Sequence, residues 1–150
     1  MYKRNQHIAL MEKLLTHLKN AKLEYLKAAD HANASEDKRF FNQQAMMRNR
    51  FFQEILSELH SLGVTSDDLI ISRFNFNQLL ISSIDTLRAT ALEKCLEADK
   101  VLLVLYAELV EGALENSKFI QHVSSLEIAV DQNEILVSNY LQKKQFNSRL

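Results

Sequence analysis

The sequence predicts an all-α protein built from four long helices in one domain. The chain has 150 residues but only two glycines and no proline. Since turns rely on these two residue types for their special backbone angles, a chain nearly free of both has few turns. Mostly apolar residues also recur at alternating spacings of three and four, the period of helices packed in a bundle. The chain is 47% hydrophobic, so we expect residues 1–150 to form a single core.

The first two helices are predicted over residues 5–32 and 36–62. The inner seam of the first is Met11, Leu14, Leu18, Ala21, Tyr25, Ala28 and Ala32. The inner seam of the second is Phe41, Ala45, Arg48, Phe52, Ile55, Leu59 and Leu62. Ser35 is expected to cap the second helix, and Gly63 suits the left-handed residue that ends it. The short connection between them predicts an antiparallel hairpin.

The third and fourth helices are predicted over residues 86–112 and 117–143. The third seam is Leu92, Cys95, Asp99, Leu102, Tyr106, Leu109 and Ala113. The fourth is Phe119, Val123, Leu126, Val130, Asn133, Val137 and Tyr140. A short break that begins at Gly112 predicts a second antiparallel hairpin.

The connection between the two hairpins, residues 63–85, is long and unusually apolar. Its apolar residues are Leu69, Ile70, Ile71, Phe74, Phe76, Leu79, Leu80, Ile81 and Ile84. We therefore expect a crossover that packs along the bundle and can contain a short helix at 76–84. One long crossover in a four-helix bundle is the ferritin-like connectivity. The alternative is an up-down-up-down bundle whose middle loop folds back.

Charge and composition exclude several classes of function. Eighteen Lys and Arg face 19 Asp and Glu, a net charge of −1, which argues against a nucleic-acid-binding protein. No apolar run reaches 18 residues, so we expect no membrane span. Without a signal-peptide core after the N-terminus, we expect a cytoplasmic protein. The single cysteine, Cys95, excludes an internal disulfide framework.

The chain resembles the bacterial four-helix-bundle proteins of unknown function that are grouped with the ferritin-like folds. The matching residues are Leu23-Glu24-Tyr25-Leu26-Lys27-Ala28-Ala29-Asp30, then Ala45, Arg48, Phe51, Glu54 and Ile55, then Cys95, Asp99 and Tyr106. The resemblance covers most of residues 8–143. The chain departs from the family pattern at Gln132, where a histidine is expected, and in a crossover that lacks the family's glycines. The resemblance implies a fold and brings no established activity.

A ferritin-like bundle raises the question of a di-metal carboxylate centre. Such a centre uses Glu-x-x-His pairs on two helices, because residues three apart share a helix face. None of the five histidines has an acidic residue three or four positions away. Arg48 also stands on the inner seam, where a cation repels a metal ion. We therefore expect no metal and no cofactor.

Arg48 and Asp99 interrupt otherwise apolar seams, and a buried charge must be paired. Counting residues along the four helices brings a polar group from each to a similar height in the bundle. Our hypothesis is that Arg48 bridges Glu24 and Asp99. Its further hydrogen-bond partners are then Tyr106, Glu127 and Asn133. The alternative is that Arg48 extends its head to the surface and Asp99 faces solvent.

The second helix carries aromatic residues on two faces. One face can fill the bundle core, and the other, with Phe40, Met47 and Phe51, needs a second cover. An apolar patch left exposed marks an interface. We therefore expect a homodimer, or else a protein partner bound at this face.

These observations predict a ferritin-like helical bundle without a complete di-metal site. Its expected role is binding or structural, and we do not expect an enzyme. The alternative is an unorthodox carboxylate metal-binding protein, for storage or oxidation, that uses Glu24, Asp99 and Glu127. The sequence gives no substrate.

Overall fold

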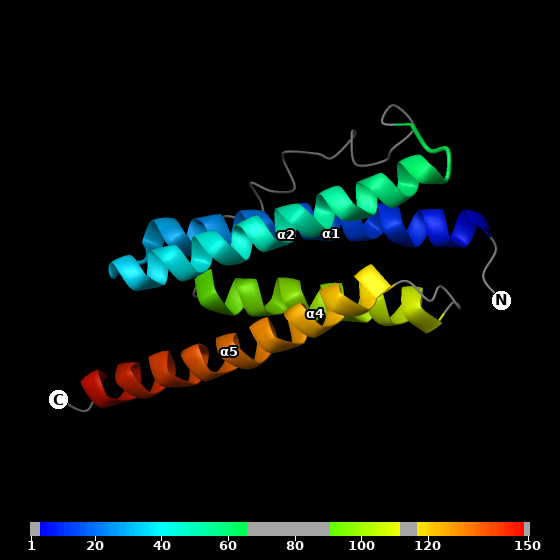
Figure 1. The fold of residues 1–150 in the computed structure, drawn as a ribbon. Helices are drawn as coiled ribbons and strands as arrows, with labels where there is room; N and C mark the ends of the chain where they lie inside the picture. Colours follow the sequence, from blue (N-terminus) through cyan, green and yellow to red (C-terminus); the bar gives the residue numbers. More distant parts are fainter. Residues whose placement is uncertain (1–3, 66–90, 112–116, 149–150) are drawn as a thin grey trace.

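The computed structural model describes residues 4–65, 91–111 and 117–148. They form four α-helices, and the described residues contain no strand (Figure 1). The helices are α1 (Arg4–His31), α2 (Ser35–Ser61), α4 (Ala91–Glu111) and α5 (Ser117–Ser148). The all-α, four-helix prediction is confirmed. Most of the predicted crossover, with its short helix at 76–84, lies outside the described residues.

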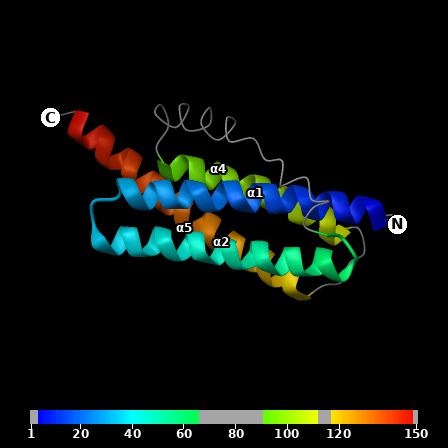
Figure 2. The same cartoon turned by 90° about the horizontal axis from the view of Figure 1, so that it is seen from above.

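The helices lie in two layers of two (Figure 1). Helix α2 returns alongside α1, and α5 returns alongside α4, while α2 and α4 run in the same direction (Figures 1 and 2). Helix α1 packs against both α2 and α4, and α5 packs mainly against α4. The arrangement leaves α5 with a broad outward face. No helix in the described part of the chain combines the length and apolarity needed to cross a membrane.

The two ends of α2 are formed in different ways. The residue before the helix is Ala34, in extended conformation and without a side-chain cap, and its carbonyl accepts from the amide of Lys38. The prediction that Ser35 is the cap is therefore wrong, because Ser35 is already the first helical residue. The C-terminal prediction is confirmed: Gly63 has a φ of 88°. Only glycine adopts that region without a steric penalty.

The other boundaries follow the predictions closely, except at the C-terminus. Helix α5 runs to Ser148, five residues beyond the predicted end at 143. The added stretch contains no glycine or proline, and lysine and glutamine are good helix formers, so nothing in it stops the helix. The predicted start of the third helix, residues 86–90, lies outside the described part of the chain.

The core consists of two apolar clusters. The larger is centred on Leu14, Leu18, Phe51, Ile55, Leu59, Leu102, Tyr106, Phe119 and Leu126. The smaller contains Tyr25, Ala28, Ala29, Phe41, Ala45 and Cys95. Each cluster encloses or borders one group of buried polar side chains, and these two groups are the candidate functional sites.

Candidate functional site: two buried polar networks

The strongest polar contact in the core joins Arg48 of α2 to Asp99 of α4. The Nε atom of Arg48 donates to Oδ1 of Asp99 at 3.0 Å, and its Nη2 donates to Oδ2 at 2.7 Å. Both side chains are 0% exposed. Two parallel, charge-assisted bonds of this kind are the strongest geometry for such a pair. Arg48 therefore does not extend to the surface, and Asp99 does not face solvent.

Three more side chains complete what we call the Arg48 network, which consists of Tyr25, Gln44, Arg48, Asp99 and Asn133. The Nη1 atom of Arg48 donates to the backbone carbonyl and to Oε1 of Gln44, both at 2.8 Å. The guanidinium lies over the ring of Tyr25, 3.9 Å from its centroid. The hydroxyl of Tyr25 donates to Oδ2 of Asp99 at 2.5 Å and accepts from Nδ2 of Asn133. All four helices thus contribute to the network.

Glu24 is not part of this network as the sequence predicted. It is buried, and its ion pair is with Lys27 at 3.6 Å. It makes no hydrogen bond to Arg48 among the described residues, where the partners of the guanidinium are Asp99 and Gln44. The Oε2 atom of Glu24 has no hydrogen-bond partner in the described structure. The predicted bridge therefore holds for Asp99 and is wrong for Glu24.

The other three predicted partners of Arg48 have three different environments in the structure. Asn133 joins the network through Tyr25. Glu127 is exposed on α5, so its expected place in the network is wrong. Tyr106 is buried but bonds elsewhere. Tyr106 lies on the same side of α4 as Asp99 but about two turns along the helix, and Glu127 differs in the direction that its side chain faces.

Tyr106 belongs to a second group, which we call the His122 network: Glu54, Tyr106 and His122. The Nδ1 atom of His122 lies 2.8 Å from the Tyr106 hydroxyl, and its Nε2 lies 2.5 Å from Oε2 of Glu54. A carboxylate only accepts, so Nε2 carries the proton and Nδ1 accepts from Tyr106. Phe51 stacks on the imidazole with ring centroids 3.9 Å apart.

Burial shifts the pKa of His122, Tyr25, Tyr106 and Cys95, which lie in or beside these networks. It is the main cause that lowers the pKa of His122, against the opposing hydrogen bond and charge of Glu54; Arg50 and Lys118 lower it further. Burial also raises the pKa of Tyr25, Tyr106 and Cys95 far above their usual values. Both phenols and the thiol are therefore neutral at pH 7, and a neutral thiol is a poor nucleophile.

Sequence reasoning did not identify Tyr25, Gln44 or His122 as network members. Tyr25 was assigned to the seam as an apolar residue. His122 lies one position before Val123, which the seam pattern preferred. The signal for His122 was its spacing: Phe119, His122 and Leu126 also follow steps of three and four, and all three are buried.

The predicted interface on α2 is wrong at its centre. Phe51 is only 2% exposed and lies in the larger cluster against His122. Phe40 and Met47 are half-buried, Phe40 with its edge on Phe41 at 5.4 Å between centroids. Either Phe51 or Phe52 satisfies the helical spacing of the inner seam. Phe51 occupies the inner position, where its ring stacks on that of His122. The exposed apolar residue of this helix is Met46.

The residues present do not fit a di-metal centre. Within the described ranges, no group of three or more His, Cys, Asp and Glu side chains could hold a metal ion. Glu24, Asp99 and Glu127, the ligands of the alternative reading, do not converge, because Asp99 is bound by Arg48 and Glu127 is exposed. A wholly buried guanidinium at the centre would repel a divalent cation.

The chain was compared with family models, with curated proteins and with solved structures, and none of the three comparisons found a match.

Proposed function

We propose that this chain is a ferritin-like four-helix protein whose role is binding or structural, with the Arg48 network in place of a di-metal centre. The main observation that supports this proposal is the wholly buried, bidentate ion pair between Arg48 and Asp99. A buried charge that lost its partner would be costly, so the pair holds α2 and α4 in one register.

Two further observations support a non-catalytic role. Three core groups that could act as nucleophiles, Tyr25, Cys95 and Tyr106, are wholly buried, and burial raises the pKa of each. Asp99 is occupied by Arg48 and Tyr25. A reacting group must reach substrate, and none of these does.

The ferritin-like assignment is supported by the parallel course of α2 and α4 (Figure 1). In ferritin-like connectivity α2 and α4 run parallel, whereas in an up-down-up-down bundle these two helices run antiparallel. A cytoplasmic location is part of the same proposal. The homodimer stays a prediction, although Phe51 no longer supports it.

The decisive experiment measures metal content after anaerobic loading of the purified chain with iron and manganese. We expect no stoichiometric metal in the wild type, in Asp99→Ala or in Glu97→Ala. Glu97 is the matched control, since it lies on the same helix with an exposed side chain. Near-stoichiometric metal that is lost in Asp99→Ala and retained in Glu97→Ala would overturn the proposal.

A further inference from the structure

The outward face of α5 carries an apolar stripe that the bundle does not use. Ile128 is 59% exposed and Ile135 is 62% exposed, although the helix buries Ala129, Val130 and Asn133 between them in sequence. Residues seven apart lie on nearly the same line of a helix. The two isoleucines therefore lie on one line of α5, and both are exposed.

Small and polar residues extend this line into a regular pattern. Ser124, Ile128, Asp131, Ile135 and Ser138 follow one another at steps of four, three, four and three. This is the spacing with which one helix packs along another at a shallow angle. We call these five residues the α5 seam. Helix α5 thus has two seams, one buried in the bundle and one open.

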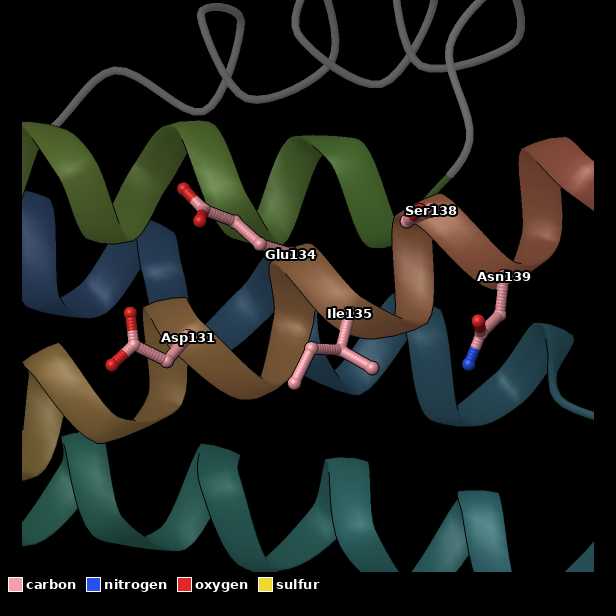
Figure 3. A pocket seen from close by; sticks show the side chains of 5 residues that line it. All are labelled: Asp131, Glu134, Ile135, Ser138 and Asn139. Carbon is pink, nitrogen blue, oxygen red and sulfur yellow. The ribbon is translucent and has the colours of Figure 1, made fainter.

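The α5 seam is hollowed at both ends. A shallow depression of about 430 Å³ is lined by Asp131, Glu134, Ile135, Ser138 and Asn139 (Figure 3). A second, of about 490 Å³, lies where Ser124 of the seam approaches Arg50 and Glu54 of α2. Figure 3 shows Ile135 and Asn139 extending from α5 on the side where α2 lies. These depressions offer space for side chains of a helix laid along α5.

The charge on and beside the seam is acidic, except at the Ser124 end, where Arg50 of α2 is exposed. Glu127, Asp131 and Glu134 are exposed along it. Glu134 pairs with Lys100 at 3.5 Å. Glu127 and Asp131 have no ion-pair partner among the described residues. Uncompensated negative charge beside an exposed apolar line attracts a cationic amphipathic surface and repels an anionic one.

We propose that the α5 seam docks one amphipathic helix of another protein, whose apolar stripe is flanked by lysine or arginine. The proposal deepens the binding role proposed above and rests on it. A second copy of this chain fits poorly. An antiparallel pairing of α5 with itself that sets Ile128 against Ile135 would place Asp131 beside the Asp131 of that copy, where like charges repel.

The test uses a fluorescent synthetic peptide of three heptads, with isoleucine and leucine on its apolar stripe and lysine beside it. Its binding to the full chain is measured by fluorescence anisotropy at about 0.15 M salt, where exposed charges more than ~8 Å apart are screened. We expect saturable binding. The double variant Ile128→Ser/Ile135→Ser should weaken it by about tenfold or more, since it removes the apolar contact. Asp131→Lys should also weaken it.

Two controls separate docking from general charge attraction. Val104→Ser removes an apolar residue of the same exposure, 60%, from α4, and it should leave the affinity unchanged. A peptide with glutamate in place of lysine should not bind. The substituted residues are exposed, so circular dichroism should show the fold intact in each variant.

Two results would overturn the proposal. One is equal binding of the peptide to wild type and to Ile128→Ser/Ile135→Ser. The other is a doubled mass by light scattering that falls to one chain in that variant, which would make a second copy the occupant. Neither result bears on metal content, so the docking proposal can fail while the metal-free bundle stands.

Discussion

Arg48 and Asp99 show how one residue pair governs a core. Removing two charges from water costs several kcal/mol per ion, and the attraction between them offsets this only with good geometry and further hydrogen bonds. Both conditions hold here, since Asp99 accepts from Arg48 at two points and from Tyr25, while Gln44 takes the remaining nitrogen of the guanidinium. The pair is therefore neutral or weakly stabilising as a unit and very costly when broken.

Asp99→Asn should lower the free energy of unfolding by about 3–5 kcal/mol, because it leaves Arg48 buried without a counterion. Urea unfolding followed by circular dichroism measures the loss. Replacing both partners, Arg48→Met with Asp99→Leu, should cost much less, since no charge is left buried. Glu97→Gln serves as the surface control and should cost under about 1 kcal/mol. A loss that small for Asp99→Asn would contradict this account.

His122 should make stability depend on pH. Its pKa is lowered in the folded state, so the unfolded chain takes up the proton more readily. The stabilising contribution is complete above the ordinary histidine pKa of about 6.5 and decreases as pH falls below that value, levelling off beneath the folded-state pKa. The slope per proton cannot exceed about 1.4 kcal/mol per pH unit.

Urea unfolding of the wild type at pH about 7.5 and about 5.5 measures this loss. In His122→Gln the loss should be smaller. It should not vanish, because the pKa of His17 is also lowered, by burial and by Lys13. Identical losses in the wild type and the variant would place the pH dependence elsewhere.

Some of these residues could be predicted from the sequence and others could not, for a physical reason. Arg48 and Asp99 could be predicted because each is a charged residue at a seam position that is otherwise apolar. Tyr25 and His122 were not, because tyrosine and histidine are common on either face of a helix. Glu24 and Glu127 were expected in the network from their estimated height along the bundle, but height along an axis does not fix which way a side chain faces.

At the scale of the elements, the end of α2 is the most sharply specified boundary. The amide of Gly63 donates to the carbonyl of His60 at 3.0 Å, and that of Val64 donates to Leu59 at 3.1 Å. These two bonds form a Schellman motif, and the side chain of Val64 packs on the cluster that contains Leu59. The motif requires positive φ at residue 63, which is why glycine there predicted the stop.

Gly63→Ala should lower the free energy of unfolding by about 1–2 kcal/mol, the cost of a left-handed backbone for an L-residue with a Cβ. Gly63→Asn should cost less, because asparagine tolerates this region. Thermal and urea unfolding of the wild type and the two variants measure the order of their stabilities. Equal stability of the alanine and glycine forms would mean that the helix end rearranges without cost.

Other boundaries were less predictable because their signals were weak. Ser35 has the right residue type for a cap, but the chain becomes helical one residue earlier than that role requires. The end of α5 has no stop signal at all, so its length follows from the helix propensity of lysine and glutamine rather than from a capping residue.

At the scale of the whole molecule, the two polar networks divide the core between them. The Arg48 network borders the smaller apolar cluster through Tyr25, and the His122 network lies in the larger one through Tyr106. They share no hydrogen-bonded residue among those the structure describes. We therefore expect the two networks to stabilise the fold independently.

Tyr25→Phe and Tyr106→Phe should each cost about 1–3 kcal/mol, because each removes a buried hydroxyl and leaves a polar partner unsatisfied. The double variant should show the sum to within about 0.5 kcal/mol. Tyr25→Phe combined with Asn133→Leu provides the contrast, since these residues share a hydrogen bond and their costs should not add. If the coupling energy between Tyr25 and Tyr106 were as large as that between Tyr25 and Asn133, the two networks would not be independent.

The fold class was predictable because it depends on the average of many residues. The helical spacing of apolar residues in four segments and the scarcity of glycine and proline predicted four helices. One side chain assigned to the wrong face does not change that prediction. The faces of α2 were not predictable to the same degree, since adjacent phenylalanines at 51 and 52 both satisfy the helical period.

The separation of Arg48 and Asp99 along the chain also affects how the protein is made. They lie 51 residues apart, so at about 5–20 residues per second the ribosome delivers Arg48 roughly 3–10 s before its counterion. During that interval, burial of the inner face of α2 would leave the charge of Arg48 without its counterion, which is costly. We therefore expect this face to stay hydrated in the nascent chain and its final burial to follow the synthesis of α4.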